Sequence, residues 1–249
     1  MTNQIATVKS LSQYTQIINQ LTRDWSDPKH GDITLWCRGQ SDAAWHLVPG
    51  EYRGPAANPG EVFSEFELKA RPLLREAPGN DWEWYFLMQH HGLRTRLLDW
   101  TTGALLALYF ALRDNPGEQD AAVWVLDPWA LNAAACGKAE LFMCTEAEAA
   151  PYAPKQRGRR RLPNQPIAVV PPYNSARITV QRGAFTIHGA NQRGLDQLGV
   201  KRLVRVKVAK DDAVLIKREL RLAGIGEFTV FPDLDGLARE ICAVHVEGC

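Results

Sequence analysis

The chain has 249 residues, with 29 Lys and Arg against 28 Asp and Glu, for a formal net charge of +1 at pH 7. Because these charges almost cancel, bulk charge gives no reason to expect a nucleic-acid-binding protein, and any polyanion must be recognised by a local patch. No internal repeat is visible, and the length suits one large core, so we expect a single domain over residues 1–249.

The sequence also bears on location and metal content. The longest apolar stretch, GALLALYFAL, has about half of the roughly 20 residues that a membrane-spanning helix needs. The N-terminal residues lack the charged start and apolar centre of a secretion signal. The five cysteines form no CxxC pair. We therefore expect a cytoplasmic protein with reduced thiols, no membrane partner and no metal.

Helices dominate the first part of the chain. Apolar residues at three- and four-residue steps predict an amphipathic helix in the N-terminal segment 1–30, and the same spacing returns at residues 61–77. Between them, residues 33–38 (ITLWCR) predict a buried strand. The aromatic segment DWEWYFLMQHHG predicts a helix that ends near Gly92, and residues 103–112 predict a helix buried on most sides.

The second part of the chain is richer in predicted strands. Residues 121–128 predict an interior strand, and residues 145–166, with prolines and four arginines, predict an exposed loop. Further strands are expected in IAVVPP, RITVQRGAFTIHG, RLVRVKV, EFTVF and EICAVHV, with helices at 211–223 and after Pro232. This order predicts an α+β fold in which N-terminal helices pack on a mixed or antiparallel sheet formed largely by the C-terminal half.

Arg38, Gly39 and Gln40 are the first candidate site residues. A guanidinium at a strand end matches two anionic oxygens of a phosphate or carboxylate, and the glycine would let a ligand approach the backbone. The alternative is a structural arginine paired with an acidic neighbour, which is common at strand ends.

The stretch HHGLRTRLLDWTT supplies the second group. His90 and its neighbour His91 cannot face the same way in regular structure, so at most one can reach a pocket, and a two-histidine metal site is not expected. Arg96 and Asp99 would form an ion pair if the turn is helical. Asp99 and Thr101 are also placed to cap the following helix, whose N-terminus would favour an anionic ligand; a purely structural cap is an equal alternative.

The third group lies late in the chain. Strand alternation puts Gln181 and Phe185 on one face, where Gln181 and His188 would touch a ligand or serve only as packed and surface residues. Farther on, Glu227 precedes an aspartate pair, Asp233 and Asp235, which would bind a cation or, as the spacing favours, cap a helix.

Four segments, in this order along the chain, together resemble the FRG domain family. They are WCRGQSDAAWHLVPG, MQHHGLRTRLLDWTTGALLALYFAL, QRGAFTIHG and FTVFPDLDGLAREI. Arg94 departs from the family, which usually has proline there, and would loosen the loop or add positive charge. The resemblance to the FRG family implies a bacterial toxin or phage-defence setting. The motif order is also distantly similar to that of ADP-ribosyltransferases, which implies a split sheet.

This second resemblance implies NAD as the cofactor and assigns roles to the candidates. Arg38, Asp99, Gln181 and Glu227 would be catalytic, and the pocket would include Arg38 and the residues Gly39, Gln40, His90, Arg96, Thr101 and Phe185. Because Gln181 cannot carry a negative charge, another carboxylate, such as Glu227, would have to enter the site. The implied partners are a protein or nucleic-acid acceptor and an antitoxin or other defence protein. The alternative function is a non-catalytic module that binds a nucleotide in the pocket or a nucleic acid at Arg157–Arg161.

Overall fold

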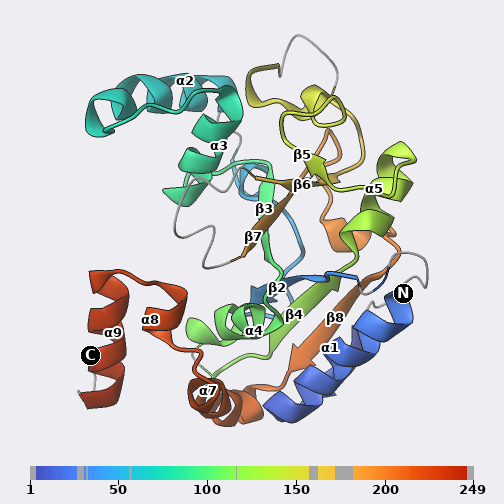
Figure 1. Ribbon diagram of the computed structural model, residues 1–249, viewed down its shortest axis with the longest axis vertical. Helices are drawn as coiled ribbons and strands as arrows, with labels where there is room; N and C mark the ends of the chain where they lie inside the picture. The colour runs from blue at the N-terminus through green and yellow to red at the C-terminus, as the bar shows by residue number, and fades with distance from the viewer. Residues whose placement is uncertain are drawn as a thin grey trace.

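The computed structural model describes residues 4–26, 31, 33–55, 58–115, 117–156, 162–171 and 182–245. Over these residues the fold is α+β, as predicted, with eight α-helices and one open, mixed sheet of eight strands (Figure 1). The strands are β1 (Gln4–Val8), β2 (Trp36–Gln40), β3 (Leu97–Thr101), β4 (Ala121–Leu126), β5 (Phe142–Met143), β6 (Ile167–Val170), β7 (Gly183–Ile187) and β8 (Leu203–Val208). The helices are α1 (Leu11–Trp25), α2 (Pro59–Ala70), α3 (Asp81–His90), α4 (Ala104–Arg113), α5 (Pro128–Cys136), α7 (Ala213–Leu222), α8 (Glu227–Val230) and α9 (Leu234–His245).

The sheet has the strand order β1-β8-β4-β2-β3-β7-β6-β5. β1 pairs with β8 and β5 with β6 in parallel, and the other neighbours are antiparallel. The strands come from both halves of the chain, with β2, β3 and β4 at the centre. β4 is buried at all six positions, which explains its unbroken apolar sequence.

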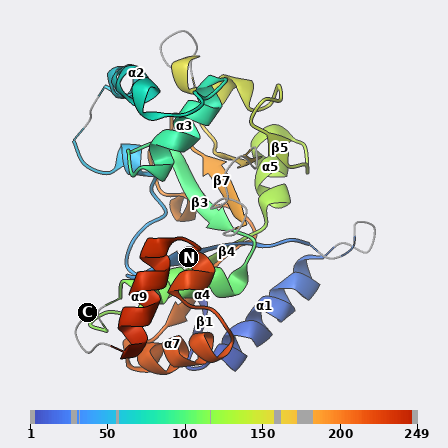
Figure 2. The same cartoon turned by 60° about the vertical axis from the view of Figure 1, so that its left-hand side comes forward.

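The helices gather at two ends of the molecule: α1, α4, α7, α8 and α9 at one end, and α2, α3 and α5 at the other (Figures 1 and 2). α1, α4 and α7 contribute to one apolar cluster with β4 and β8, and α2 and α3 pack with β3, β6 and β7 in a second. α4 is buried on most sides, as its sequence predicts. Its axis passes so close to β2 that a Cβ on Gly39 would lie 2.1 Å from the carbonyl oxygen of Ala107.

The sheet opens between β2 and β3. These strands share one register pair within the described residues, Cys37 with Thr101, whereas β2 pairs with β4 along its whole length. The ladder between β2 and β3 therefore ends where Arg38 begins, and a pocket occupies the opening.

Two predicted strands are helical. EFTVF contains α8, and residues 240–245 of EICAVHV lie within α9, whereas Val246 is outside the described residues. Their β-branched residues favour strands locally, but the segments lie away from the sheet, and Phe231 packs against Phe110 of α4 with ring centroids 6.2 Å apart. Asp233 caps α9, since its Oδ1 accepts a hydrogen bond from Gly236 N at 2.7 Å, which confirms the capping interpretation.

The segment 145–166 is not exposed throughout, because Ala149 and Tyr152 are buried. The Tyr152 hydroxyl donates a hydrogen bond to the Gln165 carbonyl at 2.6 Å within the segment, and the Tyr152 carbonyl accepts one from buried Arg96 at 2.6 Å, which holds the segment against the core. Arg157 and Arg159–Arg161 lie outside the described residues.

Two further findings concern the cysteines and the membrane. Cys37 and Cys144 are buried thiols and Cys136 is an exposed one, whereas Cys242 is disulfide-bonded, contrary to the prediction of reduced thiols throughout. Across the described ranges, none of the helices has the length and apolar character required to span a bilayer.

Candidate functional site

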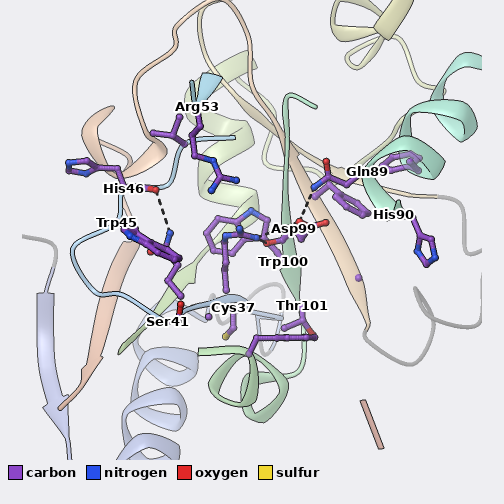
Figure 3. A pocket seen from close by; sticks show the side chains of 18 of the residues that line it. Cys37, Ser41, Trp45, His46, Arg53, Gln89, His90, Asp99, Trp100 and Thr101 are labelled. Atoms are coloured by element: carbon purple, nitrogen blue, oxygen red, sulfur yellow. Dashed lines mark hydrogen bonds and ion pairs between the residues drawn. The ribbon is translucent and has the colours of Figure 1, made fainter. Parts of the chain in front are cut away.

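A pocket of about 760 Å³ lies at the opening between β2 and β3 (Figure 3). β2 and the loop that follows form one side, and α3, β3 and β7 form the other. This size lies within the range of roughly 300–1,000 Å³ that is usual for small-molecule sites.

Arg38 and Asp99 meet in this pocket. Arg38 Nη1 donates a hydrogen bond to the backbone carbonyl of Asp99 at 2.6 Å and lies 3.7 Å from its Oδ2. The Arg38 side chain is 20% exposed and that of Asp99 is 55% exposed. The Nε of Arg38 is buried and has no hydrogen-bond partner among the described residues. The predicted convergence of a guanidinium and a carboxylate is therefore present, although most of the Asp99 side chain remains available to a ligand.

A second guanidinium, that of Arg53, faces the same pocket (Figure 3). Burial lowers the pKa of Arg38; the Asp99 carboxylate opposes this shift, and the Arg53 cation reinforces it. Arg38 stays charged near neutral pH, because a guanidinium pKa lies far above 7. Two cations thus share the pocket with one carboxylate, an arrangement that an anionic ligand would stabilise.

Arg94 holds the loop that carries Arg53. Its Nη1 donates a hydrogen bond to the Arg53 carbonyl at 2.7 Å, and a Cβ on Gly54 would lie 2.8 Å from the same nitrogen. Arg94, the residue that departs from the family pattern, therefore braces the loop that carries Arg53.

Gln89 orients the Asp99 carboxylate. Its Nε2 donates a hydrogen bond to Asp99 Oδ2 at 2.9 Å, and its Oε1 accepts one from the hydroxyl of buried Thr95. The Thr95 oxygen itself accepts a hydrogen bond from Leu97 N at 3.1 Å, so its proton is directed to Gln89. This order fixes the Gln89 amide with its NH₂ group toward Asp99, whose Oδ2 accepts the hydrogen bond.

Aromatic side chains form much of the remaining wall. Phe86 of α3 and Phe185 of β7 contact each other with ring centroids 4.9 Å apart. Trp100 is buried and donates from Nε1 to Thr186 Oγ1 at 3.0 Å, whereas Trp45 is 50% exposed. Such faces can stack on planar rings of a ligand.

The structure brings together most of the residues predicted for the site. Arg38, Gly39, Gln40, His90, Asp99, Thr101 and Phe185 all line the pocket. His90 lines it and His91 does not, as predicted for neighbouring residues on a helix. Gly39 is also required by the packing of α4, because a Cβ there would lie 2.1 Å from the Ala107 carbonyl oxygen. The Gln40 amide is also engaged, accepting from Trp124 Nε1 at 2.7 Å and donating to the His46 carbonyl at 3.4 Å.

Arg96 is not a pocket residue. It is 1% exposed, and its guanidinium donates to the carbonyls of His188 at 2.8 Å and Tyr152 at 2.6 Å. The predicted ion pair with Asp99 does not form, because Asp99 lies in extended β3 rather than in a helical turn. For the same reason Asp99 does not cap α4. The N-cap residue of α4 is Gly103, so no side chain caps this helix. The Gly103 amide donates a hydrogen bond to Thr101 Oγ1 at 3.0 Å.

The remaining candidates lie elsewhere. Gln181 is outside the described residues, so its predicted role is neither supported nor contradicted. Glu227 lines a different pocket, where Arg113 donates to it at 2.9 Å and Arg239 at 3.0 Å. Glu227 therefore does not supply the carboxylate expected in the first pocket. Its side chain is instead bound by Arg113 of α4 and Arg239 of α9. His188 is buried, and burial followed by the Arg96 cation lowers its pKa to about 3.

Sequence reasoning missed Arg53, Gln89 and Trp45. Arg53 and Trp45 lie in segments without regular periodicity, and nothing in the sequence distinguishes Gln89 from the other polar residues of its helix. The motif WCRGQSDAAWHLVPGEYR carries two of the three, so its spacing of aromatic and basic residues was the available signal.

Comparison with known proteins identifies the region around the pocket. Residues 34–120 match the family model of the FRG domain. No curated protein and no solved structure matches the chain.

Proposed function

The chain contains an FRG domain, and on this basis we propose that its pocket binds NAD and that the protein is an ADP-ribosyltransferase-like enzyme of a bacterial defence or toxin system. The observation that carries the proposal is the meeting of Arg38, Arg53 and Asp99 in one pocket with aromatic walls.

The pocket offers the groups that a dinucleotide requires. The fork of donors on a guanidinium matches the oxygens of a phosphate, so Arg38 and Arg53 are suited to the pyrophosphate. Phe86, Phe185 and Trp45 present faces for the planar rings. The opening between β2 and β3 is compatible with the split sheet that the distant resemblance implies.

Asp99 is the carboxylate suited to the chemical step, since it is the acid among the described residues that line the pocket. When the bond between ribose C1′ and the nicotinamide nitrogen breaks, its electron pair leaves with nicotinamide and the ribose becomes an oxocarbenium-like cation. An acceptor oxygen or nitrogen then bonds to C1′ and loses its proton to solvent. An ionised Asp99 beside the ribose stabilises the developing positive charge, and this role needs neither Gln181 nor Glu227.

The second candidate function is a non-catalytic module that binds a nucleotide. In that case a protein, a nucleic acid or an antitoxin would be a binding partner and not an acceptor of ADP-ribose. The contact between Arg38 and Asp99 favours it, because a carboxylate beside a guanidinium is partly neutralised and less effective toward a cation.

Release of nicotinamide from NAD separates the two functions. We expect turnover by the wild-type protein, a loss of at least about a hundredfold in Asp99→Asn with NAD binding retained, and no change in the control Asp211→Asn, an exposed position outside the pocket. NAD binding without turnover in the wild type would support the non-catalytic module. Neither binding nor turnover would overturn both functions.

A further inference from the structure

The outward face of α7 is both apolar and basic. Val214, Leu215 and Leu222 are 76%, 49% and 81% exposed, although the opposite side of the helix is buried in the core. Arg218 is exposed among these apolar residues, whereas Lys217 and Arg221 lie one helical turn apart along the flank of the helix, where Lys217 is partly buried. α7 lies at the lower edge of the molecule in both ribbon views (Figures 1 and 2). We call these six residues the α7 face.

A second pocket adjoins the α7 face. It has a volume of about 440 Å³ and lies among α4, α7, α8 and α9. Lys217 and Arg221 stand at its wall, and Leu112, Leu220 and Ile225 supply apolar surface. A large aliphatic or aromatic side chain from a partner fits such a hollow.

The cations of the α7 face are not neutralised by the acids around them. Glu227 is held by Arg113 and Arg239, and Glu219 Oε2 accepts from Leu11 N at 2.6 Å. Within the described part of the chain, Lys217, Arg218 and Arg221 form no ion pair, and Lys217 Nζ donates only to the Asn115 carbonyl at 3.2 Å.

One acid remains on the pocket wall. Glu240 Oε2 accepts a hydrogen bond from Phe228 N at 2.7 Å, so a carboxylate faces the hollow from α9. Burial, with the Arg221 cation, lowers the pKa of Lys217, while Asp114 opposes the shift. Lys217 and Arg221 thus make the α7 side of the pocket positive, whereas Glu240 places a negative group on the α9 side.

We propose that the α7 face binds an acidic amphipathic helix of a partner protein, which places an apolar side chain in the second pocket and carboxylates against Lys217, Arg218 and Arg221. Charge complementarity selects an acidic partner, and the exposed aliphatic residues select an amphipathic one. An anionic membrane is the weaker match, because the pocket is concave and α7 is fixed in the core by Ala213, Ile216 and Leu220. The proposal is independent of NAD binding.

Fluorescence anisotropy with a labelled synthetic peptide tests it. The probe is a helix with leucines and one tryptophan on one face and glutamates flanking them, compared with a scrambled peptide and with a peptide in which lysines replace the glutamates. We expect saturable binding of the acidic helix alone. Affinity should fall at least about tenfold in Arg218→Glu/Arg221→Glu and remain unchanged in Arg193→Glu/Lys201→Glu, which alters the net charge equally at exposed positions elsewhere.

Equal binding to both double variants, or equal binding of the scrambled peptide, would overturn the proposal. Sedimentation with phosphatidylserine-containing vesicles and size-exclusion chromatography with light scattering complete the test. Vesicle binding that is lost in Arg218→Glu/Arg221→Glu while the peptide fails to bind would assign the face to a membrane. A dimer lost in the same variant would assign it to a second copy of the chain.

Discussion

The guanidinium of Arg38 bonds to the backbone carbonyl of Asp99 at 2.6 Å, across the gap where the ladder between β2 and β3 has ended. A side chain thus takes the place of a backbone bond at the centre of the sheet. This contact leaves the Asp99 carboxylate exposed toward the pocket, and it places a cation beside any anion that enters.

Gln89 is expected to affect the rate of NAD cleavage more than the affinity for NAD, because it orients Asp99 and does not contribute charge. Gln89→Met removes the bond to Asp99 Oδ2, and we expect kcat to fall by up to about a hundredfold with KM nearly unchanged. Steady-state kinetics of nicotinamide release would measure both. A rise in KM with unchanged kcat would show that Gln89 binds the substrate instead.

Two substitutions of Thr95 separate its role in orienting Gln89 from its role in packing. Thr95→Val keeps the volume and loses the hydroxyl that directs Gln89, whereas Thr95→Ser keeps the hydroxyl and loses a methyl group in the core. We expect the valine variant to turn over more slowly and the serine variant to resemble the wild type. The opposite order would mean that Thr95 acts only through packing.

Gly39 is expected to be essential to stability because α4 leaves no room for a side chain. A Cβ there would lie 2.1 Å from Ala107 O and 2.4 Å from Ala111 N, and both are backbone atoms. Gly39→Ala should lower the free energy of unfolding by about 3 kcal/mol or more. The control Gly60→Ala, whose Cβ would meet only Asn58 Oδ1 at 3.5 Å, should change it by less than about 0.5 kcal/mol. Urea unfolding of both variants measures the difference.

Arg96 is expected to stabilise the fold without taking part in ligand binding. Arg96→Met leaves the carbonyls of His188 and Tyr152 without their donor in a buried site, so we expect a loss of about 3 kcal/mol in unfolding free energy. Ligand affinity, measured at a temperature where the variant is folded, should not change. A selective loss of affinity in a stably folded variant would place Arg96 in the binding site after all.

His188 is expected to make stability depend on pH. Its pKa is lowered from 6.5 to about 3 by burial and by Arg96, so between these values the unfolded chain binds more protons than the folded one. Stability should therefore fall as the pH is lowered, by about 2 kcal/mol from pH 7 to pH 5 for this residue. His188→Leu should reduce the slope over that interval in urea titrations, and an unchanged slope would exclude His188 as its source.

Hydrophobic periodicity and capping residues predicted the helices whose local sequence shows a single clear pattern. α1 follows its apolar stripe and its Ser10 cap, and α4 follows an apolar run with no competing pattern. EFTVF and EICAVHV were assigned wrongly because β-branched residues favour a strand only where a neighbouring strand is available. β1 and β5 were missed because each is a short edge strand, stabilised by pairing that the local pattern does not reveal.

The sequence predicted only those residues of the candidate site that stand in a recognisable local motif. Arg38 and Asp99 each stand in a distinctive motif, and the resemblance to the FRG domain links the two motifs. Arg96 stands in the same motif as Asp99, but its burial depends on carbonyls more than 50 residues away along the chain. The roles of Arg53 and Gln89 depend on how two loops and a helix meet around the opening in the sheet, and no local pattern specifies that.

Calorimetric titration of NAD into the wild-type protein and into Arg38→Ala/Arg53→Ala tests the central claim most directly, with Arg23→Ala/Arg193→Ala, which lies outside the pocket, as the matched control. We expect saturable binding to the wild type and the control, and a loss of at least about a hundredfold in affinity when both pocket guanidinia are removed, since each hydrogen bond to a charged group contributes about 1.5–3 kcal/mol. No binding to the wild type, or equal binding to all three proteins, would contradict NAD recognition at this pocket.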